Sequence, residues 1–149
     1  MIVVTGGAGF IGSALIWALN RRGEEDILVV DQLHRSEKWK NLVGLRFSDY
    51  LDKTVFIERL GRGYFGNRIR ALFHMGACSD TTEKNADYLM ENNYRYTARI
   101  ADWRETQPRC RLIYASSAAT YGDAPQAYAD DEASLAQLRP LNMYGYSKH

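Results

Sequence analysis

The sequence predicts an α/β fold built on a doubly wound parallel sheet with helices on both faces. Three observations predict it. Short apolar runs alternate along the chain with longer amphipathic stretches. Most of these runs are apolar without alternation, which is typical of strands that are buried on both faces. A glycine-rich turn joins the first apolar run directly to the first amphipathic stretch.

Four of the apolar runs have the length and composition of buried strands. They are rich in Ile, Val, Leu, Phe or Tyr, and they cover residues 2–4, 27–30, 71–74 and 111–115. A weaker candidate at residues 45–47 would come third in chain order.

Helices are predicted in the stretches between the strands. Residues 11–22 follow the glycine turn and stop at Gly23, a residue that commonly ends helices. A second helix is predicted to start near Asp52, although three of its residues are β-branched, namely Thr54, Val55 and Ile57.

The longest predicted helix covers residues 85–106. Apolar and aromatic positions recur along it at steps of three and four, and Pro108 ends it. Residues 122–140 are polar and irregular and include an acidic cluster at Asp130, Asp131 and Glu132, so we expect a surface excursion there. A last helix is predicted to begin near Tyr144.

The length and composition of the chain exclude several classes of function. The chain has 149 residues, the size of one domain, and we expect residues 1–149 to form a single dinucleotide-binding domain. A net charge of +1 argues against nucleic-acid binding through broad electrostatics. The sequence has no apolar stretch of membrane-spanning length, and we interpret its apolar N-terminus as a first strand and not as a signal peptide. The two cysteines lack metal-type spacing and suit a reducing compartment, so we expect a cytoplasmic protein without a metal site.

The first motif with chemical meaning is TGGAGFIG at residues 5–12. It follows a predicted strand and precedes a predicted helix, which is the context of a Rossmann-type dinucleotide site. Gly6 permits a tight turn, Gly9 lets the backbone approach a pyrophosphate, and Gly12 lets the helix pack close to the strand. The phosphates would meet the N–H groups and the positive dipole end of that helix. The alternative is a plain glycine-rich turn.

The second motif is Asp31, about 20 residues after the glycines, where a carboxylate can accept hydrogen bonds from the adenosine ribose. A carboxylate there favours NAD, because it would repel the 2′-phosphate of NADP. Cations that can accept that phosphate follow closely, at His34, Arg35, Lys38 and Lys40. Charge alone therefore leaves NAD and NADP undecided, and the four cationic residues could equally form a solvated loop.

The third motif is the Tyr-x-x-x-Lys pair of Tyr144 and Lys148. Positions i and i+4 share one face of a helix, and a nearby ammonium favours the ionised form of a phenol, which suits acid/base chemistry. Ser116 and Ser117 end the last predicted strand, where ligand crevices lie in such sheets, and one of them could bond a substrate oxygen. The alternative is that both serines cap a turn.

The segment after the strand at 71–74 is rich in small residues, which would let its backbone lie against a flat cofactor. Within it, Cys78 has no histidine or cation placed by sequence to activate it, so an inert thiol is expected. We expect His74 to be a core or turn residue and not a metal ligand.

With these motifs together, the chain resembles the extended short-chain dehydrogenase/reductases that act on nucleotide sugars. The glycine motif and Tyr-x-x-x-Lys are common to that superfamily. The stretch GACSDTTE is more specific and is similar to the branch that epimerises ADP-linked heptose at C6″. Further matches are TGGAGFIGS, ILVVDQL, ENNY, YASSAATYGD and PLNMYGYSK.

This resemblance implies an NADP-dependent epimerase acting on ADP-heptose, an isomerase of lipopolysaccharide core biosynthesis that forms homo-oligomers. Tyr144 matches the family's proton acceptor, and Lys148 its cofactor-ribose contact. The other implied NADP contacts are Phe10, Ile11, Asp31, Gln32, Lys38, Lys53, Met75, Gly76, Ala77, Cys78, Ser79 and Asn92. It favours NADP despite Asp31, with Lys38 as the phosphate partner.

Two departures from the family pattern bear on this expectation. Met75 stands where an acidic residue is expected, a change that a backbone contact would survive. The family is also about twice as long, so the sequence looks like a fragment that lacks the second, substrate-binding domain and could be inactive alone. The alternatives are another nucleotide-sugar 4-epimerase or 4,6-dehydratase, or a non-catalytic NAD(P)-binding module.

Overall fold

The protein is described here from a computed structural model, which describes residues 1–123, 128–129 and 131–149. These residues form two compact units. The first comprises residues 1–76 and 97–115, and the second comprises residues 77–96 and 116–149. No helix in the described ranges is both long enough and apolar enough to cross a membrane.

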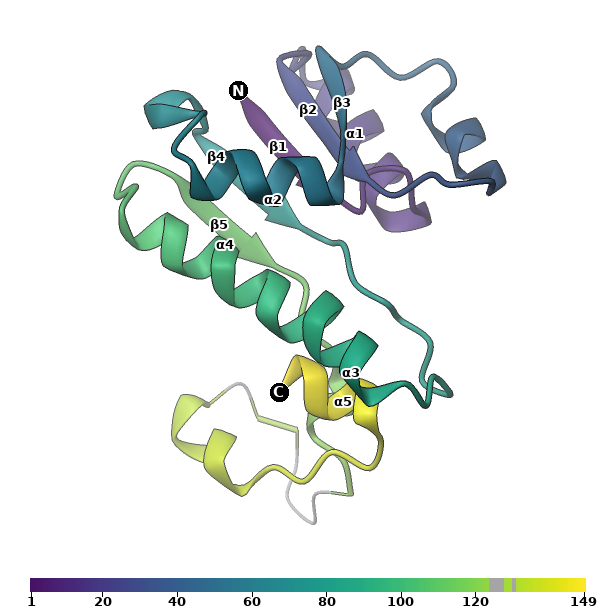
Figure 1. Ribbon diagram of the computed structural model, residues 1–149, viewed down its shortest axis with the longest axis vertical. Coiled ribbons are helices and arrows are strands. Elements are labelled where there is room, and N and C mark those ends of the chain that lie inside the picture. Colours follow the sequence, from purple (N-terminus) through teal and green to yellow (C-terminus); the bar gives the residue numbers. More distant parts are fainter. Residues whose placement is uncertain (124–127, 130) are drawn as a thin grey trace. The chain divides into compact units, whose positions relative to one another are not determined.

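A five-stranded parallel sheet forms the centre of the first unit (Figure 1). Its order is β3-β2-β1-β4-β5. The chain therefore adds β2 and β3 on one side of β1, and then crosses over to add β4 and β5 on the other side. This doubly wound topology confirms the predicted fold class. The strands are β1 (Ile2–Thr5), β2 (Ile27–Asp31), β3 (Asp49–Asp52), β4 (Ala71–His74) and β5 (Arg111–Tyr114).

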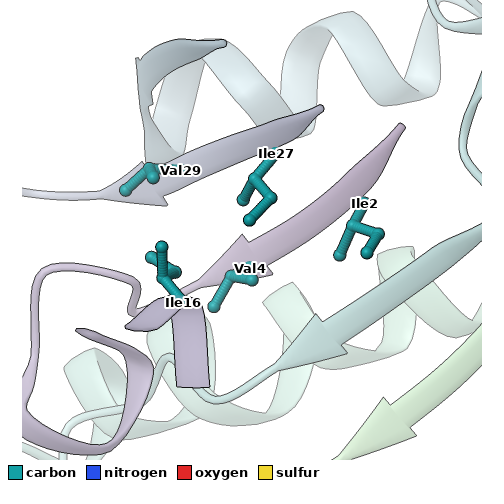
Figure 2. Packing of buried hydrophobic residues seen from close by; sticks show 5 residues of the cluster. All are labelled: Ile2, Val4, Ile16, Ile27 and Val29. Atoms are coloured by element: carbon teal, nitrogen blue, oxygen red, sulfur yellow. The ribbon is translucent and has the colours of Figure 1, made fainter. Parts of the chain in front are cut away.

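Helices cover both faces of this sheet. Helix α1 (Phe10–Arg21) lies on one face, and α2 (Lys53–Gly61) and α4 (Tyr96–Glu105) lie on the other (Figure 1). Every residue of β1 and β2 is buried, which explains why their sequences are continuously apolar. Figure 2 shows the cluster that joins these strands to α1, formed by Ile2, Val4, Ile16, Ile27 and Val29.

The prediction of the third strand at residues 45–47 is wrong. The strand is β3, Asp49–Asp52, which pairs with β2 only and is therefore an edge strand. Its residues are half-buried or exposed, so it needs no apolar run and carries the polar sequence DYLD. Leu45 and Phe47 are apolar because they pack against the core cluster from the preceding connection.

The second predicted helix is present despite its β-branched residues. The Asp52 carboxylate caps α2 by accepting a hydrogen bond from the backbone N–H of Thr54 at 2.8 Å. Such a cap stabilises a helix by about 1 kcal/mol, which offsets the weaker propensity of several β-branched residues.

The predicted long helix is present from Ala86 to Glu105, but its middle is not α-helical. Helix α3 (Ala86–Leu89) passes into a π-helical turn at Met90–Arg95 before α4 begins. A π-helical turn inside an α-helix is a frequent mark of a functional site. This turn contains Asn92 and Asn93, and both residues have a low helix propensity, which is consistent with a departure from regular α-helix here.

The remaining described residues of the second unit are largely irregular, which agrees with the prediction for the described part of residues 122–140. They include short 3₁₀ turns at Ala118–Thr120 and Glu132–Gln137 and the C-terminal helix α5 (Met143–Lys148). The predicted helix near Tyr144 is thus confirmed. Of the predicted surface excursion, residues 124–127 and Asp130 of the acidic cluster lie outside the described residues.

Candidate functional site

The glycine turn between β1 and α1 leaves the N-terminus of α1 open. Gly9 is the N-cap residue, no side chain caps the helix there, and the first turn carries no acidic residue. Phe10 and Ile11 are 86% and 66% exposed, so α1 begins with two apolar residues at the surface. An uncapped helix N-terminus offers N–H groups and a positive dipole end to an anion.

Gly9 and Gly12 serve different purposes in this turn. A Cβ atom at Gly12 would lie 2.1 Å from the Gly6 carbonyl oxygen, so this glycine is required by the fold. At Gly9 the backbone is extended (φ −77°, ψ 172°), a conformation open to any residue, and a Cβ would meet only the Gly6 oxygen at 3.2 Å. The fold therefore requires glycine less strictly at position 9 than at position 12, and, apart from residue 9 and its chain neighbours, no described atom other than the Gly6 oxygen lies within 4 Å of the Cβ position.

Asp31, at the end of β2, ties the glycine turn to the strand beside it. Its Oδ2 accepts a hydrogen bond from the Ala8 N–H at 2.9 Å, and its Oδ1 lies 2.9 Å from the Lys38 ammonium. The Asp31 side chain is 5% exposed, whereas that of Lys38 is 45% exposed. The structure therefore brings together the residue that favours NAD and the cation that favours NADP, and the lysine neutralises the carboxylate.

In the second unit, Asn93 is a residue that the sequence did not single out. It is 1% exposed, and its amide bonds both backbone groups of Cys78, accepting from the N–H at 2.8 Å and donating to the carbonyl at 3.0 Å. The same amide nitrogen donates to Ser147 Oγ at 3.0 Å. Asn93 thus fixes the segment around Cys78 to helix α5 within this unit.

Helix α5 carries Tyr144 and Lys148 on one face, both about nine-tenths buried. The helix starts at Asn142, whose side chain accepts from the Gly145 N–H at 2.7 Å. A Cβ at Gly145 would lie 2.5 Å from the Ala119 carbonyl oxygen, so glycine is needed for α5 to lie against the 3₁₀ turn that follows Ser117. The unit therefore brings the Tyr144 helix close to the segment that carries the two serines.

The charge of Lys148 is affected by its burial. Desolvation lowers the pKa of its ammonium from 10.5 to about 8. The group is still largely protonated at neutral pH, so it is an ammonium one helical turn from a phenol. A buried cation is costly to stability, and a buried lysine with a strongly lowered pKa is a candidate for a functional role.

The sign of this effect gives a prediction about stability. Between pH 8 and 10.5 the unfolded chain keeps the Lys148 proton that the folded chain has lost, so this group makes stability rise with pH in that window. Lys148→Met removes the charge whose burial is costly, so its stability relative to wild type should be most favourable below pH 8. Denaturant unfolding at several pH values measures it: this relative stability should fall as pH rises from 8 to 10.5.

Lys84→Met is the matched control, because Lys84 is exposed. That variant should change stability little at any pH. A Lys148→Met protein whose stability relative to wild type does not change between pH 8 and 10.5 would contradict the account of Lys148.

Ser117 caps the 3₁₀ turn that follows it, which was the alternative considered for the serines. Its Oγ accepts from the Ala119 N–H at 3.2 Å, and its carbonyl accepts from the Thr120 hydroxyl at 2.7 Å. The capping bond uses one acceptor position of the Ser117 hydroxyl and not its hydrogen. Ser116 is exposed. Both serines line a cavity of about 400 Å³ whose described walls include Thr120, Tyr121, Asp131 and Glu132.

The other predicted cofactor residues are distributed over both units. Gln32 and Lys53 follow β2 and β3 in the first unit, and Lys53 is the first residue of α2. Met75 and Gly76 end the first unit, whereas Ala77, Cys78, Ser79 and Asn92 belong to the second. Asn92, which was predicted to bind the cofactor, donates from its side-chain nitrogen to Asn93 Oδ1 at 3.0 Å. It therefore supports Asn93, which bonds the backbone of Cys78.

Comparison with known proteins places these residues in a family. Residues 2–149 match the family described as NAD dependent epimerase/dehydratase. An ADP-L-glycero-D-manno-heptose-6-epimerase of Nitratidesulfovibrio vulgaris is 53% identical over 148 residues, which are 99% of this chain and 46% of the relative. The chain therefore spans about half the length of the curated relatives it matches.

Two solved structures share the fold. The Helicobacter pylori ADP-L-glycero-D-manno-heptose-6-epimerase has a TM-score of 0.78 and 30% identity, covering 99% of this chain and 47% of that one. The Thermus thermophilus UDP-glucose 4-epimerase, solved as a complex with NAD, has a TM-score of 0.74 and 26% identity over the same shares. The chain belongs to the NAD dependent epimerase/dehydratase family.

Proposed function

We propose that the protein carrying this chain is a nucleotide-sugar epimerase that inverts C6″ of an ADP-linked glycero-manno-heptose with a bound nicotinamide dinucleotide. The pairing of Tyr144 with a buried ammonium on one face of α5 carries the chemical part of the proposal. The sugar is inferred from the name of the relative that is 53% identical.

The first unit supplies the features that a dinucleotide requires. The open N-terminus of α1 and the space in front of Gly9 fit a pyrophosphate, which would take its hydrogen bonds from the first-turn N–H groups. Asp31 and Lys38 lie at the end of the neighbouring strand and would hold the adenosine ribose. Lys148 would bond the second ribose, as the family resemblance implies.

When bound, a nicotinamide cofactor takes up a hydride and returns it. Tyr144 would hold the proton of the C6″ hydroxyl while that carbon is a ketone, and would give it back when the ketone is reduced on its other face. Lys148 would favour the ionised phenol during this exchange. Ser117 or Ser116 would bond the C6″ oxygen, and Asn93 would act as a positioning residue that fixes α5 through Ser147.

We propose NADP as the preferred dinucleotide. Lys38 neutralises the carboxylate that would otherwise repel a 2′-phosphate, and its half-exposed ammonium is available to that phosphate.

Lys38→Gln should therefore weaken NADP binding by roughly 10- to 100-fold, the effect of losing one charge-assisted hydrogen bond, and should change NAD binding much less. Calorimetric titration with both dinucleotides measures this. Lys40→Gln is the control, because Lys40 pairs with Glu37 on the same 3₁₀ turn and should affect neither affinity. If the wild-type protein binds NAD as tightly as NADP, the proposal that Lys38 binds the 2′-phosphate is contradicted.

The substrate is tested by offering three nucleotide sugars with each dinucleotide and separating the products chromatographically. Interconversion of the two C6″ epimers of ADP-glycero-manno-heptose supports the proposal. Conversion of UDP-glucose or dTDP-glucose instead would indicate a 4-epimerase or a 4,6-dehydratase. Dinucleotide binding without conversion of any sugar would favour a non-catalytic binding module.

A further inference from the structure

A buried histidine lies between two threonine hydroxyls in the first unit. His74, at the end of β4, is 1% exposed. Its Nδ1 is 2.6 Å from Thr5 Oγ1 at the end of β1, and its Nε2 is 2.8 Å from Thr97 Oγ1 on α4. Its ring stacks on Tyr114 of β5, with centroids 5.6 Å apart. The imidazole is thus fixed on both nitrogens and on one face, with no part in the chemistry proposed above.

Thr5 makes a second contact that reaches the segment after β4. Its Oγ1 accepts a hydrogen bond from the Gly76 N–H at 3.1 Å. Thr5 and His74 are the last register pair between β1 and β4, so Gly76 lies just beyond the end of the ladder. The Thr5 hydroxyl therefore holds the backbone of Gly76, two residues after the end of β4.

At this point the backbone beyond β4 touches the glycine turn without any side chain between them. A Cβ at Gly6 would lie 2.7 Å from the Gly76 Cα, and a Cβ at Gly76 would lie 2.9 Å from the Gly6 nitrogen. Side-chain packing cannot hold two glycines together, so hydrogen bonds to Thr5 hold the contact. The Met75 N–H donates to the Thr5 carbonyl at 3.3 Å, and the bond to the Thr5 side chain is the one from the Gly76 N–H. That bond in turn depends on the rotamer of Thr5, which the contact with His74 fixes.

We propose that His74 is a positioning residue for the dinucleotide site: through Thr5 it fixes Gly76 against the glycine turn and so sets the backbone that receives the cofactor. The inference rests on the proposed dinucleotide binding. Thr97 Oγ1 holds the opposite nitrogen of the same ring, whereas the Gly76 N–H bonds to Thr5, so loss of the Thr97 hydroxyl should affect stability more than the site.

Three single substitutions separate these roles. Thr5→Val keeps the shape of the side chain and removes the hydroxyl, Thr5→Ser keeps the hydroxyl, and Thr97→Val removes a hydroxyl from the other side of His74. The readouts are hydrogen exchange of the Gly76 amide by NMR without cofactor, the affinity for NADP and NAD by calorimetry, and the melting temperature. The amide readout does not depend on cofactor binding.

Thr5→Val should speed exchange of the Gly76 amide and weaken dinucleotide binding by roughly tenfold or more, equivalent to about 1.4 kcal/mol. Thr5→Ser should restore both. Thr97→Val should lower the melting temperature but leave both quantities within about threefold of wild type. Equal effects of Thr5→Val and Thr97→Val on affinity, or no effect of either, would overturn the proposal.

A double substitution tests whether His74 acts through Thr5. His74→Phe keeps a ring against Tyr114 and should weaken binding by itself, but adding it to Thr5→Val should weaken binding no further. Additive losses would show that His74 affects binding by another route and would overturn the inference. If wild-type protein binds neither dinucleotide, the proposed function fails, while the Gly76 exchange rates still test the positioning role.

Discussion

Replacing Tyr144 by phenylalanine should lower epimerase turnover by roughly 10²- to 10⁴-fold, the usual contribution of a positioned acid or base. The substitution keeps the buried ring and removes only the hydroxyl that would exchange a proton with the C6″ oxygen. Dinucleotide affinity should stay nearly unchanged, because in the proposed mechanism the phenol contacts the sugar. Steady-state rates on ADP-heptose and a calorimetric titration measure the two quantities.

Tyr146→Phe is the matched control on the same helix. Tyr146 is 59% exposed, so the loss of its hydroxyl should leave turnover at the wild-type level. If Tyr144 only packs against its neighbours, the two variants should behave alike. A Tyr144→Phe protein with normal turnover would remove this residue from the mechanism.

Gly9→Val should abolish dinucleotide binding without unfolding the protein. The backbone of residue 9 is extended and a Cβ there would lie 3.2 Å from the Gly6 oxygen, so we expect the fold to survive the substitution with a shift of a few tenths of an ångström in the turn. The branched side chain would fill the space where a pyrophosphate meets the N-terminus of α1. Losing two charge-assisted hydrogen bonds corresponds to a roughly 100-fold or larger loss of affinity. Calorimetry gives the affinity, and circular dichroism reports whether the fold is intact.

Gly12→Ala provides the contrast. A Cβ at that position would lie 2.1 Å from the Gly6 oxygen, so even alanine should lower the melting temperature markedly. The two substitutions in one motif should therefore have different effects. Gly9→Val should lose dinucleotide binding, whereas Gly12→Ala should destabilise the turn. Normal dinucleotide binding by Gly9→Val would show that the phosphate site lies elsewhere.

The sequence was sufficient to predict the fold because the central strands are buried on both faces. The apolar runs at β1 and β2 follow directly from that burial, whereas β4 alternates between half-buried and buried residues. The prediction failed at β3, because this edge strand has the polar sequence DYLD. The apolar residues nearby, Leu45 and Phe47, pack against the core from the preceding loop. The hydrophobic pattern reports which residues are buried, so it did not identify the polar edge strand β3, although it identified β5 at the other edge.

The candidate site was predictable only in part, for a similar reason. Tyr144 and Lys148 share a helix, so their spacing was enough to pair them. Asn93 bonds Cys78 and Ser147, which are 15 and 54 residues away, and no local pattern encodes such a contact. The pairing of Lys38 with Asp31 depends likewise on how the loop after β2 folds back.

The most direct test of the central claim is the fate of a deuterium placed at C6″ of ADP-glycero-manno-heptose. If epimerisation proceeds by removal and return of a hydride, the opposite epimer should form with its deuterium retained, and no solvent hydrogen should enter C6″. Mass spectrometry and NMR of the product in ordinary and heavy water measure this. Loss of the deuterium to solvent, or a failure to interconvert the epimers in the presence of dinucleotide, would contradict the account.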